Sequence, residues 1–118
     1  MQSDPMLDLL PAGAATMPLL QELGDALIAY TPPNFQIIHC EITEGREQDQ
    51  RALFCKISCP QFPDDGTTVV NDRVHKAATR LVQRLVAPAR GTFPGVAITL
   101  AKQKDSSWRH NMRFLTAA

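Results

Sequence analysis

The most constraining feature of this sequence is the stretch NDRVHKAATRLVQRLVA, residues 71–87, whose pattern fits an amphipathic helix. At helical spacing its apolar side chains share one arc, and four basic side chains fall within about 80° of one another on a different arc. These basic residues are Arg73, Lys76, Arg80 and Arg84. Asn71 is a suitable N-cap, and Pro88 and Gly91 predict the end of the helix. The apolar arc predicts that other elements pack against this helix.

A second helix is predicted over Thr16–Tyr30, where the apolar residues share an arc of about 120°. Thr16 suits the N-cap position, and Pro18 lies in the first turn, where a missing N–H costs little. Gly24 weakens the helix by about 1 kcal/mol relative to alanine, so this helix depends on packing. Residues 1–15 are predicted to form a flexible N-terminal arm that precedes a single domain, residues 16–118.

Four segments alternate apolar and polar residues, which is the pattern of half-buried β-strands. They are Phe35–Thr43, Arg51–Ser58, Phe93–Lys102 and Trp108–Leu115. Residues 44–50 are predicted to be a polar loop, and residues 59–70 an irregular connection. The order α-β-β-α-β-β predicts an α+β fold, a four-stranded antiparallel sheet with two helices packed on one face. The other face is then left partly exposed, with Glu41, Lys56, Arg109 and Arg113.

The two halves of the chain also resemble each other. Seven apolar positions between Leu27 and Ile42 recur 58 residues later, between Leu85 and Leu100. Two helix-plus-hairpin units built alike produce such a similarity by chance fairly often. The repeat therefore supports the architecture without establishing a duplication.

The three cysteines are predicted to be reduced thiols. Matching the apolar faces of the first two strands places Cys40 directly opposite Cys55 inside the core, as two small buried residues. The sequence contains no C-x2-C pair and no H-x3-H pair, and His39 and Cys40 are adjacent and so face opposite ways on a strand. Cys59 and His75 could approach each other as a nucleophile and a base, but no oxyanion hole or signature accompanies them. We therefore expect no enzyme activity, no metal and no cofactor.

The net charge is zero, but the charges are unevenly distributed along the chain. Residues 1–50 hold eight acidic residues and one basic residue, whereas residues 51–118 hold four acidic and eleven basic residues. This polarity either steers a charged partner or cancels across the fold. The chain shows no signal peptide and no apolar run of about 18 residues, so we expect a cytoplasmic protein without a membrane segment.

Acidic residues gather around the connection between the first two strands. Glu41, Glu44, Glu47 and Asp49 accompany one basic residue, Arg46. This cluster is either an ordinary soluble loop tip or a patch of carboxylates presented to a basic partner. Further along the chain, Asp64 and Asp65 precede a glycine in a pattern typical of a turn.

The segment LLQELGDALIAYTPPNF and the closing hairpin FPGVAITLAKQKDSSWRHNMRFL resemble the small immunity proteins of the YezG-like group. The similarity spans residues 16–115 and lies in the order of elements and in their pattern. It implies a monomer or weak dimer that binds and neutralises a cognate toxin C-terminal domain, such as a nuclease, from a polymorphic or contact-dependent toxin system. The acidic hairpin, with Asp64 and Asp65, would then cover a basic active site.

Two other functions remain open from the sequence. A homodimeric type III secretion chaperone is similar in its first helix, strands and second helix, although such chaperones are usually acidic, longer and end on a further helix. A nucleic-acid-binding module would use the basic face of helix 71–87, but no aromatic residues for base stacking accompany that face. A stable dimer with apolar grooves would favour the chaperone, and salt-dependent nucleic-acid binding would favour the third function.

Overall fold

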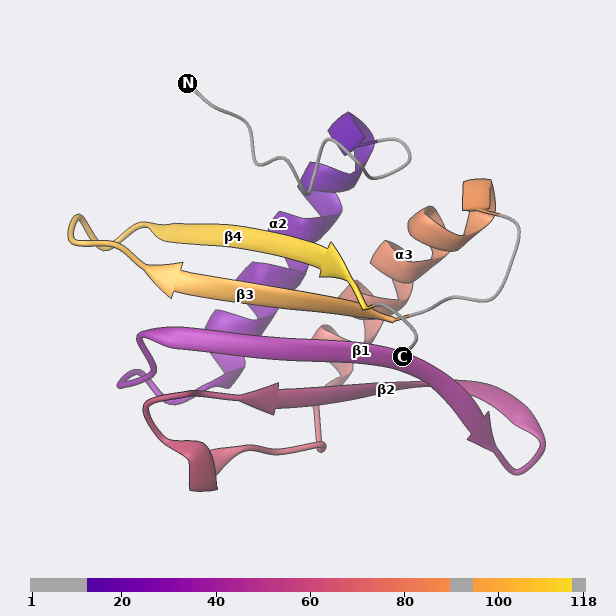
Figure 1. Cartoon of the computed structure of the whole chain (residues 1–118), viewed down its shortest axis with the longest axis horizontal. Helices are drawn as coiled ribbons and strands as arrows, with labels where there is room; N and C mark the ends of the chain where they lie inside the picture. Colours follow the sequence, from indigo (N-terminus) through magenta and orange to yellow (C-terminus); the bar gives the residue numbers. More distant parts are fainter. Residues whose placement is uncertain (1–12, 90–94, 116–118) are drawn as a thin grey trace.

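The computed structural model describes residues 13–89 and 95–115, and it confirms the α+β class and the α-β-β-α-β-β order (Figure 1). The elements are α2 (Gly13–Tyr30), β1 (Ile37–Glu47), β2 (Gln50–Ser58), the short 3₁₀-helix η1 (Pro63–Asp65), α3 (Asp72–Ala89), β3 (Val96–Lys102) and β4 (Trp108–Phe114). The four strands form one antiparallel sheet in the order β2-β1-β3-β4. Both helices lie on the same side of this sheet, as predicted (Figure 1).

The two halves of the chain meet at the central strands, β1 and β3. In this antiparallel pair Cys40 faces Ile98, and Ile42 faces Val96. Cys40 and Ile98 are also 58 residues apart, which is the offset of the sequence repeat. Ile38 faces Leu100, the equivalent of Ile42, and Ile42 faces Val96, the equivalent of Ile38. This reciprocal pairing is the one expected when a pseudo-two-fold axis between the two helix-plus-hairpin units passes beside Cys40 and Ile98.

The core lies between the helices and the covered face of the sheet. Its largest fully buried side chains are Leu20, Leu23, Leu27, Ile38, Ile42, Ile57, Val74, Leu81, Leu85, Ile98, Leu100 and Met112. Each of them lies on a helix arc or strand face that the sequence pattern groups together. Burial of these side chains, at about 1.5–3 kcal/mol each, is the main stabilising contribution to the fold.

Helix α2 begins earlier than predicted. It starts at Gly13, so that Thr16 lies inside the first turn and is fully buried, and the prediction of Thr16 as the N-cap is wrong. The two alanines before Thr16 favour helix more than any other residue, which is why the helix extends toward the N-terminus. Residues 13–15 of the predicted flexible arm therefore belong to α2, and residues 1–12 lie outside the described part of the chain.

Helix α3 has the predicted N-cap. The Asn71 Oδ1 atom accepts a hydrogen bond of 2.9 Å from the Val74 N–H, which satisfies one of the free donors of the first turn. The helix ends at Ala89, two residues beyond the predicted end. Gly91, which was predicted to help end it, lies outside the described residues.

The prediction of a polar loop over residues 44–50 is wrong. β1 continues to Glu47 and β2 begins at Gln50, so that only Gln48 and Asp49 form the turn. Their φ angles of 52° and 65° are those of a two-residue turn in which both residues are left-handed, the type I′ turn. Such turns usually contain glycine, and its absence here removes the sequence signal.

The tight turn also changes the strand register by two residues. Cys40 faces Ile57, and Cys55 faces Ile42, so the predicted direct pairing of Cys40 with Cys55 is wrong. A shift of two residues keeps every side chain on its predicted face, which is why the core is unaffected. The two thiols are diagonal neighbours on the covered face of the sheet.

The first strand is shorter at its start than predicted. β1 begins at Ile37, and Phe35 belongs to the core, where its ring stacks on Phe62 with centroids 5.8 Å apart and planes 13° apart. β3 begins at Val96, residues 93–94 lie outside the described part, and β4 ends one residue early, at Phe114. The stacking of Phe62 on Phe35 thus joins the connection after β2 to the residues just before β1.

Candidate protein-binding site

The first hairpin extends beyond the four-stranded part of the sheet. Pairing of β1 with β3 ends at Ile42 and Val96, whereas pairing of β1 with β2 continues for five more residues, to Glu47. At about 3.4 Å per residue, these five residues reach roughly 17 Å past the last pair with β3. Figure 1 shows this end of the hairpin bending away from the sheet. We call residues 43–54 the projecting hairpin.

The projecting hairpin carries part of the predicted acidic cluster. Glu47 and Asp49 are exposed at its tip, next to the exposed Arg46, while Glu44 is half-buried and makes a polar contact. Glu41 lies apart from them, on the open face of the four-stranded part of the sheet. The tip therefore presents two carboxylates, in a backbone turn that holds them away from the body of the protein.

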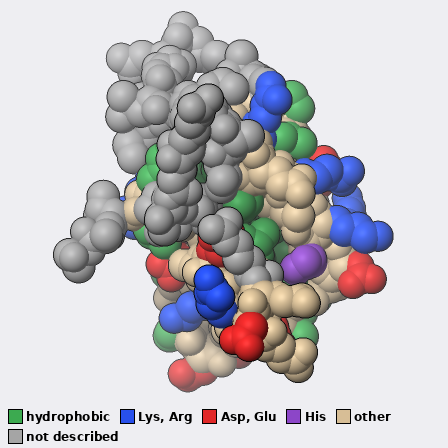
Figure 2. All heavy atoms as spheres, turned by 90° about the vertical axis from the view of Figure 1, so that its right-hand side faces the viewer, with side chains coloured by type: hydrophobic (Ala, Val, Ile, Leu, Met, Phe, Trp, Pro, Cys, Tyr) green, Lys and Arg blue, Asp and Glu red, His purple; other side chains and the backbone are tan. Residues whose placement is uncertain are grey.

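Asp64 and Asp65 lie far from this tip. They form η1, which follows the opposite end of β2, and β2 alone spans about 26 Å (Figure 1). Both side chains are exposed. The structure thus does not bring the predicted acidic residues into one patch. Figure 2, which views the molecule from the end of the projecting hairpin, shows acidic and basic side chains next to one another.

The projecting hairpin also carries an aromatic residue, Phe54, that the sequence pattern alone does not mark as a binding residue. Phe54 faces Thr43 across the strands, and its side chain is 45% exposed. Its ring covers Gly45, where a Cβ atom would lie 2.7 Å from Phe54 Cε2. A glycine within a strand is a known signal of close approach by a neighbour, and here it marks the aromatic residue. An exposed ring of this kind is typical of an anchor in protein interfaces.

A hollow lies beside this ring on the open face of the sheet. It has a volume of about 380 Å³ and is lined by Glu41, Thr43, Phe54, Cys55, Lys56 and Thr68. Lys56 and Glu41 face each other directly across β2 and β1. The hollow can therefore receive an apolar side chain against Phe54, with one basic and one acidic group at its border.

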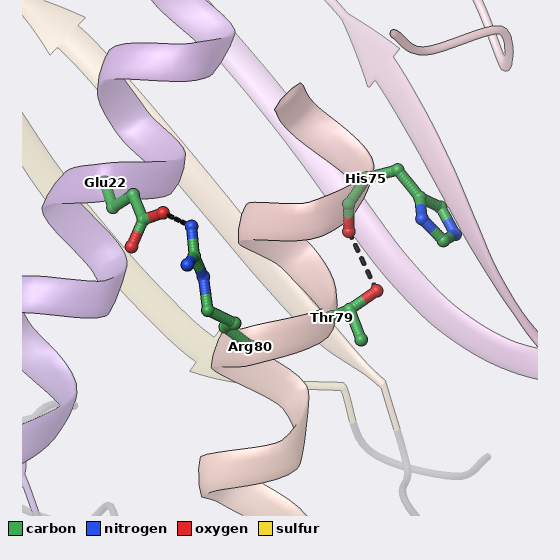
Figure 3. A network of polar contacts seen from close by, with 4 residues as sticks. All are labelled: Glu22, His75, Thr79 and Arg80. Carbon is green, nitrogen blue, oxygen red and sulfur yellow. Dashed lines mark hydrogen bonds and ion pairs between the residues drawn. The ribbon is translucent and has the colours of Figure 1, made fainter. Parts of the chain in front are cut away.

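The predicted basic residues lie on the outer face of α3. Arg73, Lys76, Arg80 and Arg84 are all exposed. Arg80 forms an ion pair with Glu22 of α2, which joins the two helices (Figure 3). His75 is exposed on the same helix, and its carbonyl accepts a hydrogen bond of 2.8 Å from the Thr79 hydroxyl. Part of the basic face is thus neutralised by the first half of the chain.

The thiols lie in the core. Cys59 is 1% exposed, whereas His75 faces solvent, so these two residues form no exposed nucleophile–base pair. The hydrogen bond with Cys55, together with burial, raises the pKa of the Cys40 thiol well above 9.0. Within residues 13–89 and 95–115, no three histidine, cysteine, aspartate or glutamate side chains are grouped to hold a metal ion.

Comparisons with known proteins leave the function to be argued from this site. No known protein family matches the sequence, and no curated protein is similar to it. In the described part of the chain, neither helix has the length and apolar character needed to cross a membrane. The projecting hairpin combines an exposed aromatic ring with carboxylates at its tip.

Proposed function

We propose that this protein is an immunity protein, which uses the projecting hairpin to bind and neutralise a cognate toxin domain. The observation that carries the proposal is the length of β1, which continues five residues past its last pair with β3. Among residues 13–89 and 95–115, no third strand pairs with these five residues, and a hairpin of two strands is only marginally stable by itself. The extension therefore contributes little to the stability of the fold. We infer that its role is to contact a partner.

The surface of the hairpin supports a protein partner with a basic site. Phe54 supplies an exposed aromatic ring, and Glu47 and Asp49 supply carboxylates about the turn. A buried aromatic anchor gives affinity, while rim charges mainly raise the association rate. A toxin that acts on nucleic acid has a basic active site, and the tip carboxylates are suited to enter or cover it.

The experiment is a pull-down from native host lysate, followed by kinetics with the captured toxin fragment. We expect a one-to-one complex. Glu47→Lys should slow association about tenfold at low salt, and Phe54→Ala should speed dissociation about tenfold. Asp25→Lys is the matched control, because Asp25 is an exposed acidic residue on α2 that lies outside the hairpin.

Three results would overturn the proposal. The first is recovery of an effector's unfolded N-terminal region in a complex with a dimer, and the second is recovery of nucleic acid alone. The third is a toxin complex in which both hairpin variants bind at the same rates as the Asp25→Lys control. The third result would leave an immunity role in place but move its site away from the hairpin.

A further inference from the structure

The outer edge of β2 is paired at one residue. The Ile57 N–H donates to the Thr67 carbonyl, and the Thr67 N–H donates to the Ile57 carbonyl, each over 2.8 Å. The backbone groups of Ile57 therefore point away from β1. Because these directions alternate along an antiparallel strand, the N–H and C=O groups of Leu53 and Cys55 point the same way.

The segment that pairs with Ile57 then leaves the edge. If pairing continued, Val69 would face Cys55. Instead the Val69 N–H donates to the Thr67 hydroxyl oxygen over 3.0 Å, and the Val69 carbonyl accepts a hydrogen bond of 2.6 Å from the Tyr30 hydroxyl. The Val69 side chain is left 70% exposed. Among the described residues, the outward backbone groups of Leu53 and Cys55 have no backbone partner.

The free part of this edge coincides with the apolar part of the surface. Phe54 lies between Leu53 and Cys55, and the hollow of about 380 Å³ is lined by Phe54, Cys55 and Thr68. Phe54 and Val69 are the exposed large hydrophobic side chains of the described chain. Unpaired backbone groups beside a side-chain pocket are the features that bind an extended peptide as an additional strand.

We propose that an extended segment of the toxin adds as a strand to the outer edge of β2, beside Leu53 and Cys55. This inference rests on the proposed function and specifies how the partner binds. An apolar side chain of the segment enters the hollow against Phe54, and a basic side chain lies toward Glu47 and Asp49 at the tip. The added strand forms its hydrogen bonds with the backbone groups of Leu53 and Cys55. The partner segment therefore needs no particular sequence there beyond an alternation of apolar and polar residues.

On the face of the hairpin that carries Phe54, the charged residue of β1 at the tip is Glu47, whereas Arg46 lies on the opposite face. The acidic charge on this face favours a basic segment over a second copy of this chain. The edge is free only from Cys55 toward the turn, because Thr67 already occupies Ile57. A segment that pairs along this stretch approaches the carboxylates of Glu47 and Asp49 at one end. A basic residue at that end is attracted, and an acidic residue there is repelled.

The test uses the whole protein and a phage-displayed library of random linear twelve-residue peptides. We expect enriched peptides that alternate apolar residues with polar ones and carry a basic residue near one end. Residue-resolved amide exchange of the complex should then show slowing of about tenfold or more at Leu53 and Cys55. Ala52 and Phe54 are the internal control, because their N–H groups already point to β1 and should change little.

A Leu53→Pro variant removes one outward N–H, and Leu53→Ala is its matched control. Strand addition predicts that the enriched peptide binds Leu53→Pro at least about tenfold more weakly than Leu53→Ala. Thermal melting checks that both variants fold. The amide-exchange experiment uses the wild-type protein, so it tests the inference even if a variant does not fold. No enrichment of alternating peptides, or a bound peptide that leaves the exchange at Leu53 and Cys55 unchanged, would overturn the inference.

Two outcomes separate this inference from the proposed function. A captured toxin that leaves these amides unprotected removes strand addition and keeps the immunity role. An enriched peptide that protects them, with a pull-down that recovers no toxin, removes the immunity role and keeps the edge as a peptide site. Protection of the same amides at high protein concentration without peptide assigns the edge to a second copy and overturns the proposal.

Discussion

Gly24 in the middle of α2 packs directly against His110 of β4. A Cβ atom at position 24 would lie 2.4 Å from Nε2 and 2.7 Å from Cδ2 of this imidazole. The Nε2 atom is buried and has no hydrogen-bond partner among the described residues. Because a Cβ atom does not approach other heavy atoms this closely, Gly24→Ala forces the ring to move within a packed region.

Two opposing effects set the size of the change. Alanine favours the helix over glycine by about 1 kcal/mol. Overpacking of a filled core opposes this by about 1–3 kcal/mol. With an overpacking cost of about 2 kcal/mol, Gly24→Ala should lower the free energy of unfolding by about 1 kcal/mol. In a His110→Ala background the same substitution should raise it by about 1 kcal/mol, since the ring is gone.

The assay is urea denaturation of the wild type, the two single variants and the double variant. The double-mutant cycle should give a coupling free energy of about 2 kcal/mol between positions 24 and 110. If Gly24→Ala changes the free energy of unfolding equally in both backgrounds, the close approach of His110 does not explain the glycine, and the packing argument fails.

Three further predictions follow from the backbone, the thiols and one carboxylate. Gly95 has φ of +100°, and a Cβ there would lie 2.9 Å from a leucine side chain and 3.2 Å from a carbonyl oxygen, so Gly95→Ala should destabilise by about 2 kcal/mol in urea denaturation. Cys40, Cys55 and Cys59 are at most 4% exposed, so a thiol reagent at pH 8 should label them only after denaturation. Hydrogen bonds from the serine two residues on lower the pKa of Asp105 below its ordinary 3.8, so its stabilising effect is present above that pH and is lost as pH falls through the folded pKa. The melting temperatures of wild type and Asp105→Ala should therefore differ at neutral pH and converge near about pH 2.

The core could be predicted from the sequence because its signal is periodic. Val74, Leu81 and Leu85 repeat at helical spacing, and Ile38 and Ile42 at strand spacing, and all five are at most 1% exposed. Burial of apolar area depends on such spacing and not on the exact ends of the elements. Errors of one to four residues at the helix and strand ends therefore left the predicted core intact.

The site could be predicted only in part. Alternation with Leu53 and Cys55 already places Phe54 on the face opposite the core, so its orientation was present in the sequence. Its place on an extended hairpin was not, because that depends on a turn at Gln48 and Asp49 that lacks glycine. It also depends on where β3 begins beside β1, which is a long-range pairing that local patterns do not encode.

The pseudo-two-fold arrangement shows where the two halves differ. Helices α2 and α3 each have 18 residues, and the pairing of β1 with β3 places Cys40 opposite its equivalent in the repeat, Ile98. The hairpins do not match, because β1 has 11 residues and a two-residue turn, whereas β3 has 7 residues and leads into a five-residue connection. The shorter hairpin shows that the sheet is complete without the extension. The residues that extend the β1–β2 hairpin can therefore change in sequence without loss of the core. We expect the partner-binding surface on this hairpin, because it is the part in which the two halves differ.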